Sequence, residues 1–181
     1  MLKERKRLLA YLKKKEAAVY KADLLGREIV RECGSAIKDL HAGRVAGAEK
    51  KKDGIEKKVK ELKKLDRSEY NIAFQEYAEL CIIISIYKKM SIPSIKEIGV
   101  KEESYILGLL DATGEMKRYM YNLLMKGDIE KAKKVFAIMD GLFSDLSEFC
   151  FSDRILPNFR PKQDAFRIQL EQARAEMLRW L

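Results

Sequence analysis

Apolar residues recur at every third or fourth position over most of the chain, and this spacing is typical of one face of an α-helix. The pattern predicts six long helices, over residues 3–40, 45–65, 68–90, 102–126, 128–149 and 162–181. The segment SIPSIKEIGV is expected to be a connector with one short helical turn, because Pro93 interrupts the helical pattern there. No stretch of useful length alternates with period two, so the sequence predicts an all-α fold.

Turn-forming residues separate the later helices. Gly127 is placed to end one helix in the left-handed conformation that glycine adopts at low cost. Asp128 follows directly and is expected to cap the next helix. Pro157 and Pro161 bracket a predicted loop before the last helix. No linker or internal repeat divides the sequence, so residues 1–181 are expected to form a single helical domain.

The helix predicted over 68–90 is apolar in nearly every direction around its axis. Such a helix is buried on most of its sides. A thin single bundle offers too little cover for that much apolar surface, which favours packing against further copies of the chain. A stable homo-oligomer is therefore expected.

Charge is distributed unevenly along the 181 residues, whose formal net charge is +9. Residues 1–65 contain 20 Lys and Arg against 10 Asp and Glu, while residues 66–181 contain 17 against 18. A basic first third favours a polyanionic partner, although a lysine-rich helix that faces solvent has the same composition. The candidate phosphate contacts lie in the second predicted helix: Lys50, Lys51, Lys52, Lys57 and Lys58.

Other features of the sequence indicate a soluble, cytoplasmic protein. The longest apolar run, Leu80 to Ile86, is far too short to cross a bilayer. The first residues, MLKERKRLLAYLKKK, are charged throughout and do not resemble a signal peptide. The three cysteines lie far apart with no CxxC pair, so we expect reduced, mostly buried thiols and no zinc site.

A single histidine restricts the chemistry that the chain can perform. His41 alone cannot form the two-histidine acid/base pair of a metal-free ribonuclease within one subunit. A Ser-His-Asp or Cys-His site would need all of its partners around this one residue. His41 lies in the polar segment KDLHAGR and is interpreted as a surface histidine near a helix end. Any catalysis is therefore expected to depend on carboxylates.

Two pairs of carboxylates are candidates for that role. Glu76 and Glu79 are one turn apart on the helix expected to be buried, and Asp111 and Glu115 are one turn apart on the next long helix. Buried carboxylates repel each other and persist when a cation lies between them, either Lys or Arg or a divalent metal. The second pair also fits a solvated helix face on which Arg118 satisfies Glu115.

Four carboxylates on two helices form the kind of oxygen-rich ligand set that Mg²⁺ or Mn²⁺ prefers. Helical bundles can direct acidic pairs from facing helices toward one shared ion. The Glu-x-x-His ligands of di-iron bundles are absent, which argues against redox iron. Spacing alone does not single out these four residues, because Asp145 and Glu148 are spaced equally well.

The residues around both acidic pairs resemble the translin/Trax superfamily. QEYAEL and, later in the chain, DATGEM are similar to the paired motifs of Trax. The segments YILGLLDATGEMKRYMYNLLMKGDIEKA, FAIMDGLFSDLSEF and REIVRECGSAIKDLHAGR also resemble family segments, in the family's order. The resemblance covers most of the chain. Its four acidic positions are closer to Trax than to translin, which lacks the complete set.

This resemblance implies about seven helices in a bundle that assembles into a hollow octameric barrel and binds RNA or single-stranded DNA. It implies that Glu76, Glu79, Asp111 and Glu115 hold Mg²⁺, or Mn²⁺, for endonucleolytic cleavage of RNA inside the barrel. We expect the first three to ligate the ion and Glu115 to complete the shell or orient the attacking water. Single-stranded RNA is the expected substrate, with duplex RNA as the alternative. The connector is short where eukaryotic Trax carries an insertion, which favours a homo-oligomer over assembly with a translin-like partner chain.

Two other functions fit the same sequence. One is a translin-like module that binds single-stranded RNA or DNA without catalysis, its carboxylates engaged in structural ion pairs. The other is a helical scaffold for a protein partner, with no nucleic acid bound. Salt-dependent RNA binding separates the scaffold from the other two functions, and metal-dependent cleavage separates the nuclease from the binding module.

Overall fold

The computed structural model describes residues 4–65 and 71–180, and these residues are helical except for short turns and one longer loop. The elements are α1 (Arg5–His41), α2 (Val45–Lys64), α3 (Asn71–Lys89), α4 (Ile95–Ile98), α5 (Glu102–Met125), α6 (Ile129–Ser147), α7 (Phe159–Met177) and the 3₁₀ turn η2 (Leu178–Trp180). The described residues contain no strand, so the expectation of an all-α fold with about seven helices is confirmed. None of the described helices is long and apolar enough to span a bilayer.

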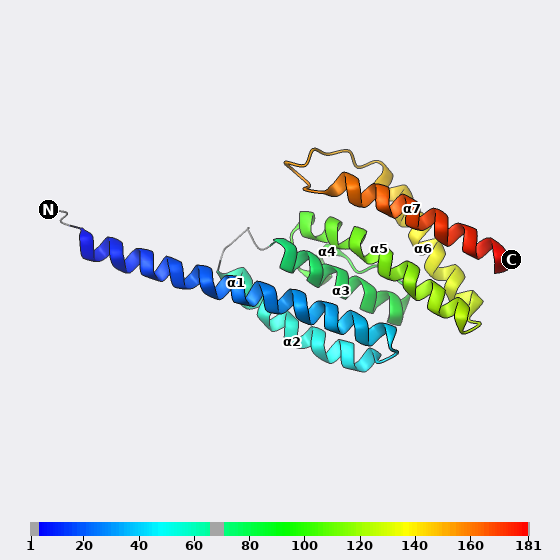
Figure 1. The fold of residues 1–181 in the computed structure, drawn as a ribbon, viewed down its shortest axis with the longest axis horizontal. Coiled ribbons are helices and arrows are strands. Elements are labelled where there is room, and N and C mark those ends of the chain that lie inside the picture. The colour runs from blue at the N-terminus through cyan, green and yellow to red at the C-terminus, as the bar shows by residue number, and fades with distance from the viewer. Residues whose placement is uncertain (1–3, 66–70, 181) are drawn as a thin grey trace.

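The helices lie side by side in an elongated bundle (Figure 1). The helices α1, α3, α5 and α7 run in one direction, and α2 and α6 return between them. The N-terminal ends of α3, α5 and α7 therefore lie at one end of the bundle. At that same end the first half of α1 projects beyond the other helices.

The helix α3 occupies the centre of the bundle and packs against α1, α2 and α5. Its residues Ile82, Ile83 and Ile86 are fully buried within the single chain. Contrary to the expectation from the sequence, α3 needs no further copies of the chain to cover it, because three neighbouring helices already cover its apolar surface. Large apolar side chains are left exposed on α1, at Leu8, Leu9, Tyr11, Leu12, Tyr20 and Leu24.

The predicted helix ends agree with the structure except at the last helix. Gly127 has a φ of 76°, and the side chain of Asp128 accepts a hydrogen bond from the backbone N–H of Lys131, as expected. Pro161, however, lies inside the first turn of α7 and does not border the loop. Proline is tolerated there because the first N–H groups of a helix have no partner within the helix. The predicted helix starts at residues 3 and 68 and the end at residue 181 lie outside the described residues.

The helices α3 and α5 pack closely where Gly108 faces the α3 backbone. A Cβ atom at position 108 would lie 2.7 Å from the carbonyl oxygen of Gln75 and 2.8 Å from the Cβ atom of Ala78. Real Cβ atoms do not lie that close to another heavy atom, so only glycine permits this contact. The contact fixes the distance between Glu79 on α3 and Asp111, which follows one turn later on α5.

We predict that Gly108→Ala lowers the free energy of unfolding by about 2 kcal/mol, the typical cost of forcing an extra methyl group into a packed core. The matched control is Gly54→Ala in α2, where a Cβ atom would meet nothing within 4 Å. That control should stabilise the protein by about 0.5–1 kcal/mol, because alanine is the better helix former. Urea unfolding of the two variants beside the wild type measures both effects. Equal stability of both variants would contradict the close contact.

Candidate active site

The structure brings the four predicted carboxylates together where α3 packs against α5. Glu76 and Glu79 come from α3, while Asp111 and Glu115 come from α5. The charges of Glu76, Asp111 and Glu115 all act on Glu79, and the charge of Asp111 acts on Glu76. The four residues therefore form one electrostatic cluster, as the motif spacing predicts.

Glu79 is the most deeply placed member, with an exposed fraction of 9%. Burial, and after it the negative charges of Glu76, Asp111 and Glu115, together raise the pKa of its carboxyl group to about 8. Burial, followed by the charge of Asp111, also raises the pKa of Glu76. The positive charge of Lys162 acts in the opposite direction and lowers the pKa of both Glu76 and Glu79. The cluster thus holds more negative charge than its own surroundings neutralise.

Asp111 is held by two side chains that the sequence did not predict. One carboxylate oxygen accepts a hydrogen bond from the side-chain amide of Gln75 on α3. The other oxygen pairs with the ammonium group of Lys162 on α7. This contact connects the last helix of the chain to the carboxylate cluster.

Glu115 is held by His41, which comes from the end of α1. The imidazole Nε2 donates to the carboxylate, and this hydrogen bond is the main reason that the pKa of Glu115 is lowered. The hydroxyl of Tyr87 lies 3.0 Å from the other ring nitrogen, Nδ1. Tyr87 in turn stacks on Tyr119, with ring centroids 3.7 Å apart. Both ring nitrogens of the histidine are therefore engaged.

Two interpretations of the sequence are wrong at this point. His41 is not a surface histidine, because its side chain is only 4% exposed and lies inside the helix packing. The stripe that carries Asp111 and Glu115 is not a solvated helix face, because both side chains are mostly buried against α1, α3 and α7. Arg118 does pair with Glu115, but at 3.8 Å and from an exposed position. The competing pair Asp145 and Glu148 is exposed at the end of α6.

The donor set fits a hard divalent cation. Within residues 4–65 and 71–180, the carboxylates of Glu76 and Glu79 have no hydrogen-bond or ion-pair partner, although Glu79 is buried and Glu76 is half-buried. Buried carboxylates without partners are unfavourable unless they are protonated or a cation joins them. In the same ranges, no three His, Cys, Asp or Glu side chains stand in a finished metal-binding arrangement. Asp111 pairs instead with Lys162, and Glu115 accepts a hydrogen bond from His41.

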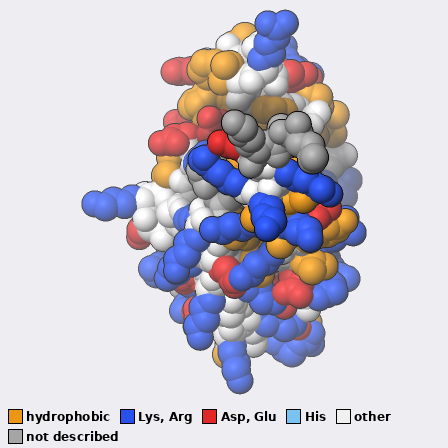
Figure 2. All heavy atoms as spheres, turned by 90° about the vertical axis from the view of Figure 1, so that its left-hand side faces the viewer, with side chains coloured by type: hydrophobic (Ala, Val, Ile, Leu, Met, Phe, Trp, Pro, Cys, Tyr) orange, Lys and Arg blue, Asp and Glu red, His pale blue; other side chains and the backbone are white. Residues whose placement is uncertain are grey.

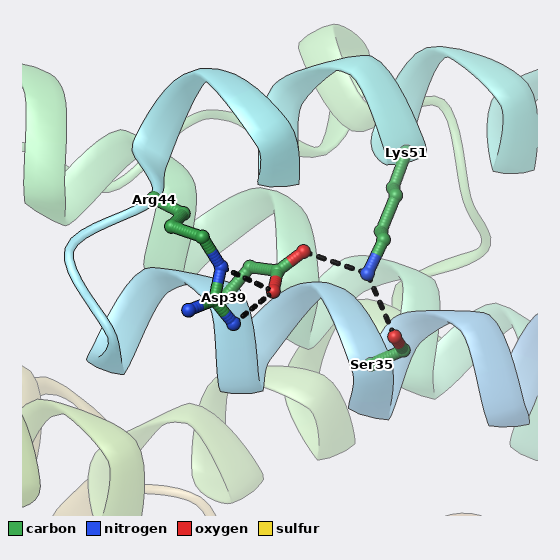
Figure 3. Close-up of polar contacts among 4 residues, drawn as sticks. All are labelled: Ser35, Asp39, Arg44 and Lys51. Atoms are coloured by element: carbon green, nitrogen blue, oxygen red, sulfur yellow. Dashed lines mark hydrogen bonds and ion pairs between the residues drawn. The ribbon is translucent and has the colours of Figure 1, made fainter.

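The predicted basic residues of α2 divide into two groups. Lys51, Lys52 and Lys58 each pair with acidic side chains. Figure 3 shows Lys51 pointing toward α1, where its ammonium group lies 2.6 Å from Asp39 and 2.8 Å from the hydroxyl of Ser35. The ion pairs of these three lysines reduce the positive charge that the helix presents to a ligand.

Lys50 and Lys57 are exposed, and in the part of the chain that the structure describes neither pairs with an acidic side chain. Figure 2 views the end of the bundle from which α1 projects, and Lys and Arg side chains dominate the middle and lower part of this face. The basic character of the N-terminal helices is thus visible on the surface, even though part of it is neutralised.

Sequence reasoning missed Gln75, Lys162 and the contact made by His41. Gln75 precedes the first acidic residue inside the QEYAEL motif, so the motif itself carried a signal. Lys162 lies in a segment without any motif, and only the packing of α7 against α5 brings it to Asp111. His41 lies far from Glu115 in sequence, and only the packing of the bundle brings the two side chains together.

The Translin family matches residues 66–175, more than half of the chain, and the chain belongs to this family. An uncharacterized protein of Methanocaldococcus jannaschii is 29% identical over 96% of this chain and 81% of its own length. Among solved structures, apo-NeC3PO has a TM-score of 0.85 at 27% identity, covering 99% of this chain and 98% of that chain. The AfC3PO–duplex RNA complex has a TM-score of 0.84 at 23% identity, covering 97% and 95%.

We predict that the unliganded protein loses stability as the pH rises from about 5 to about 8. The raised pKa of Glu79 means that the folded state binds a proton in this range that the unfolded state has released, so unfolding becomes easier with rising pH. The loss should be on the order of 4 kcal/mol. In Glu79→Gln this contribution is absent. Urea unfolding in EDTA at pH 5 and pH 8 measures the difference, and parallel profiles of the two proteins would contradict it.

Proposed function

We propose that this protein is a Mg²⁺-dependent endoribonuclease of the Trax type, active as a homo-oligomer. Membership of the Translin family and the fold shared with C3PO structures support an RNA-binding role. The observation that carries the catalytic proposal is the burial of Glu79 among three further carboxylates, with Lys162 as the opposing charge. A pure binding surface for a polyanion has no use for four clustered negative charges, because they repel the phosphates.

The residues have distinct roles in this proposal. Glu76, Glu79 and Asp111 hold the ion, and Glu115 completes its shell or orients the attacking water. Bound Mg²⁺, or Mn²⁺, supplies a water of lowered pKa and neutralises charge that develops on the phosphate. His41 fixes the position of Glu115 through the bond from Nε2, while Tyr87 fixes the imidazole from its other side. Gln75 fixes Asp111 in the same way from α3.

The nucleophile in this proposal is water and not the ribose 2′-hydroxyl. Both nitrogens of the lone His41 are engaged by Glu115 and Tyr87, so no free imidazole is present to remove the 2′-hydroxyl proton. Attack by water leaves the 3′-hydroxyl on one product strand. The proposed substrate is single-stranded RNA, and duplex RNA is the alternative, since AfC3PO has been solved with a duplex.

A second function, nucleic-acid binding without cleavage, is favoured by the ion pairs that the cluster makes. Lys162 neutralises Asp111, and His41 engages Glu115, which is what a purely structural network contains. If the network is purely structural, removing one member of an ion pair should lower the free energy of unfolding, because the other charge loses its partner. The two functions differ most clearly at Glu79, which has no partner to lose in the described residues.

We predict that Glu79→Gln and Asp111→Asn abolish Mg²⁺-dependent cleavage of labelled single-stranded RNA. Glu79→Gln should do so without loss of stability in EDTA, because it removes repulsion and breaks no pair. Asp145→Asn, at an exposed carboxylate on α6, is the matched control and should cleave like the wild type. Added Mg²⁺ should raise the melting temperature of the wild type more than that of either site variant. Cleavage by the wild type in EDTA would refute the metal mechanism, and full activity of Glu79→Gln would refute the assigned residues.

We further propose that the chain forms a homo-oligomer, an octamer as in the barrel that the resemblance implies, with the projecting half of α1 in the contact between copies. Leu8, Leu9, Tyr11 and Leu12 are each at least 43% exposed on this half of the helix. A run of exposed large apolar side chains on one helix marks an interaction surface. The proposed assembly is therefore supported by the exposed apolar side chains of α1 and not by α3.

Light scattering at micromolar concentration is predicted to report a mass of several copies of the 21.0 kDa chain, with eight copies as the expected assembly. The double substitution Leu8→Glu with Leu12→Glu should shift the protein toward smaller species, because it places charge in the apolar contact. Ile168→Glu changes an equally exposed apolar residue of α7 and should leave the mass unchanged. A monomeric wild type would refute the assembly, and an unaffected double variant would refute the role of α1.

A further inference from the structure

A cavity of about 610 Å³ adjoins the carboxylate cluster at the end of the bundle where α3, α5 and α7 begin. Its cationic side chains are Lys101 before α5, Arg154 in the loop before α7, and Lys162 in α7. Its neutral polar side chains are Gln75, Ser104 and Asn158. Gln75 and Lys162 also contact Asp111, so the cavity and the cluster share a wall.

The cavity has the electrostatics of an anion site. Three cationic side chains line it against one acidic side chain, Glu103. Two long helices begin at its wall, α5 after Lys101 and α7 after Asn158. Neither of these N-cap residues makes a side-chain capping hydrogen bond. At α5 the first N–H groups are therefore left without a side-chain cap. At α7 the N–H of Phe159 donates to the carbonyl of Leu156 and Pro161 has no N–H, so Arg160 supplies the open N–H of that first turn. Helix N-termini with open N–H groups attract anions.

A buried hydroxyl gives an independent indication of a ligand. Ser104 lines the cavity with an exposed fraction of 1%, and its Oγ atom has no hydrogen-bond partner within the described residues. A buried hydroxyl without a partner is unfavourable, and nearly all such groups in folded proteins are satisfied. A ligand with acceptor oxygens in the cavity would satisfy it.

We propose that this cavity is a phosphate subsite that binds a phosphate group of the RNA strand beside the carboxylate cluster, an inference that rests on the proposed function. A polyanionic strand is repelled by four clustered carboxylates and needs cations close by to hold it there. Lys101 and Arg154 supply that attraction without contacting the carboxylates, and Ser104 donates to a phosphate oxygen. Lys162 lies at the boundary between the subsite and Asp111.

The test measures binding and not cleavage. Fluorescence anisotropy in EDTA gives the Kd of the full-length chain for labelled single-stranded RNA at several salt concentrations. The double variant Lys101→Gln with Arg154→Gln should bind about tenfold more weakly, and its salt slope should fall by about one. Lys126→Gln with Lys134→Gln removes the same charge from exposed positions outside the cavity and is the matched control.

Two single variants separate a phosphate subsite from a general loss of positive charge. Ser104→Ala changes no charge and removes a hydroxyl that has no partner, so it should fold normally and weaken binding several-fold. Glu103→Gln removes the acidic side chain of the cavity and should tighten binding. Equal Kd values for the cavity double variant and its control, with Ser104→Ala unchanged, would overturn the subsite while leaving the proposed function intact.

Two further probes complete the test. RNA with a 5′-phosphate should bind more tightly than the same RNA with a 5′-hydroxyl if the subsite takes a strand end, and the double variant should lose that difference. If the subsite takes an internal phosphate, the two RNAs should bind equally, and the double variant should weaken both to the same extent. Pyrophosphate is the probe that does not depend on RNA. A wild type that binds no RNA refutes the proposed function, yet a pyrophosphate-dependent rise in melting temperature that the double variant lacks still supports the subsite. The absence of that rise in the wild type overturns it.

Discussion

The repulsion among four carboxylates packed between α3 and α5 is the constraint on which the rest of the structure depends. The two helices approach so closely at Gly108 that no larger residue fits, and this contact brings Glu79 within the field of Glu76, Asp111 and Glu115. Folding alone gives no reason to bury like charges together, because the desolvated carboxylates cost free energy. The proposed cation site accounts for this arrangement, because the binding energy of a cation would offset the cost.

The cluster is held by helices from opposite ends of the chain. His41 reaches Glu115 from the end of α1, and Lys162 reaches Asp111 from the start of α7. Since both contacts cross the bundle, the geometry of the site depends on the packing of the whole domain. Both partners orient the carboxylate that they contact, and the hydrogen bond from His41 lowers the pKa of Glu115. Burial and neighbouring negative charges raise the pKa of Glu76 and Glu79 instead.

The direction of the helices and the position of the cationic side chains favour the same end of the bundle. Because α3, α5 and α7 run in parallel, their positive ends meet on the side of the cluster where Lys101 and Arg154 also lie. The cavity there offers attraction to phosphate immediately beside a group of carboxylates that repels it. A cationic cavity next to an acidic cluster can position an RNA strand, because the cavity holds one phosphate while the neighbouring phosphate faces the carboxylates.

The sequence by itself determined the helices, most of their ends and the four acidic positions. Helical periodicity and helix caps are local. The acidic pairs that begin at Glu76 and Asp111 are singled out by the resemblance of QEYAEL and DATGEM to the Trax motifs, because spacing alone fits other pairs equally well. Only the tertiary structure decided what neutralises those charges, since His41 and Lys162 are brought to the site by packing between segments remote in sequence. It also decided that α3 is covered within one chain, and that Pro161 lies inside a helix. Local patterns fix which face of a helix is apolar or charged, whereas the partner of that face depends on how the helices pack.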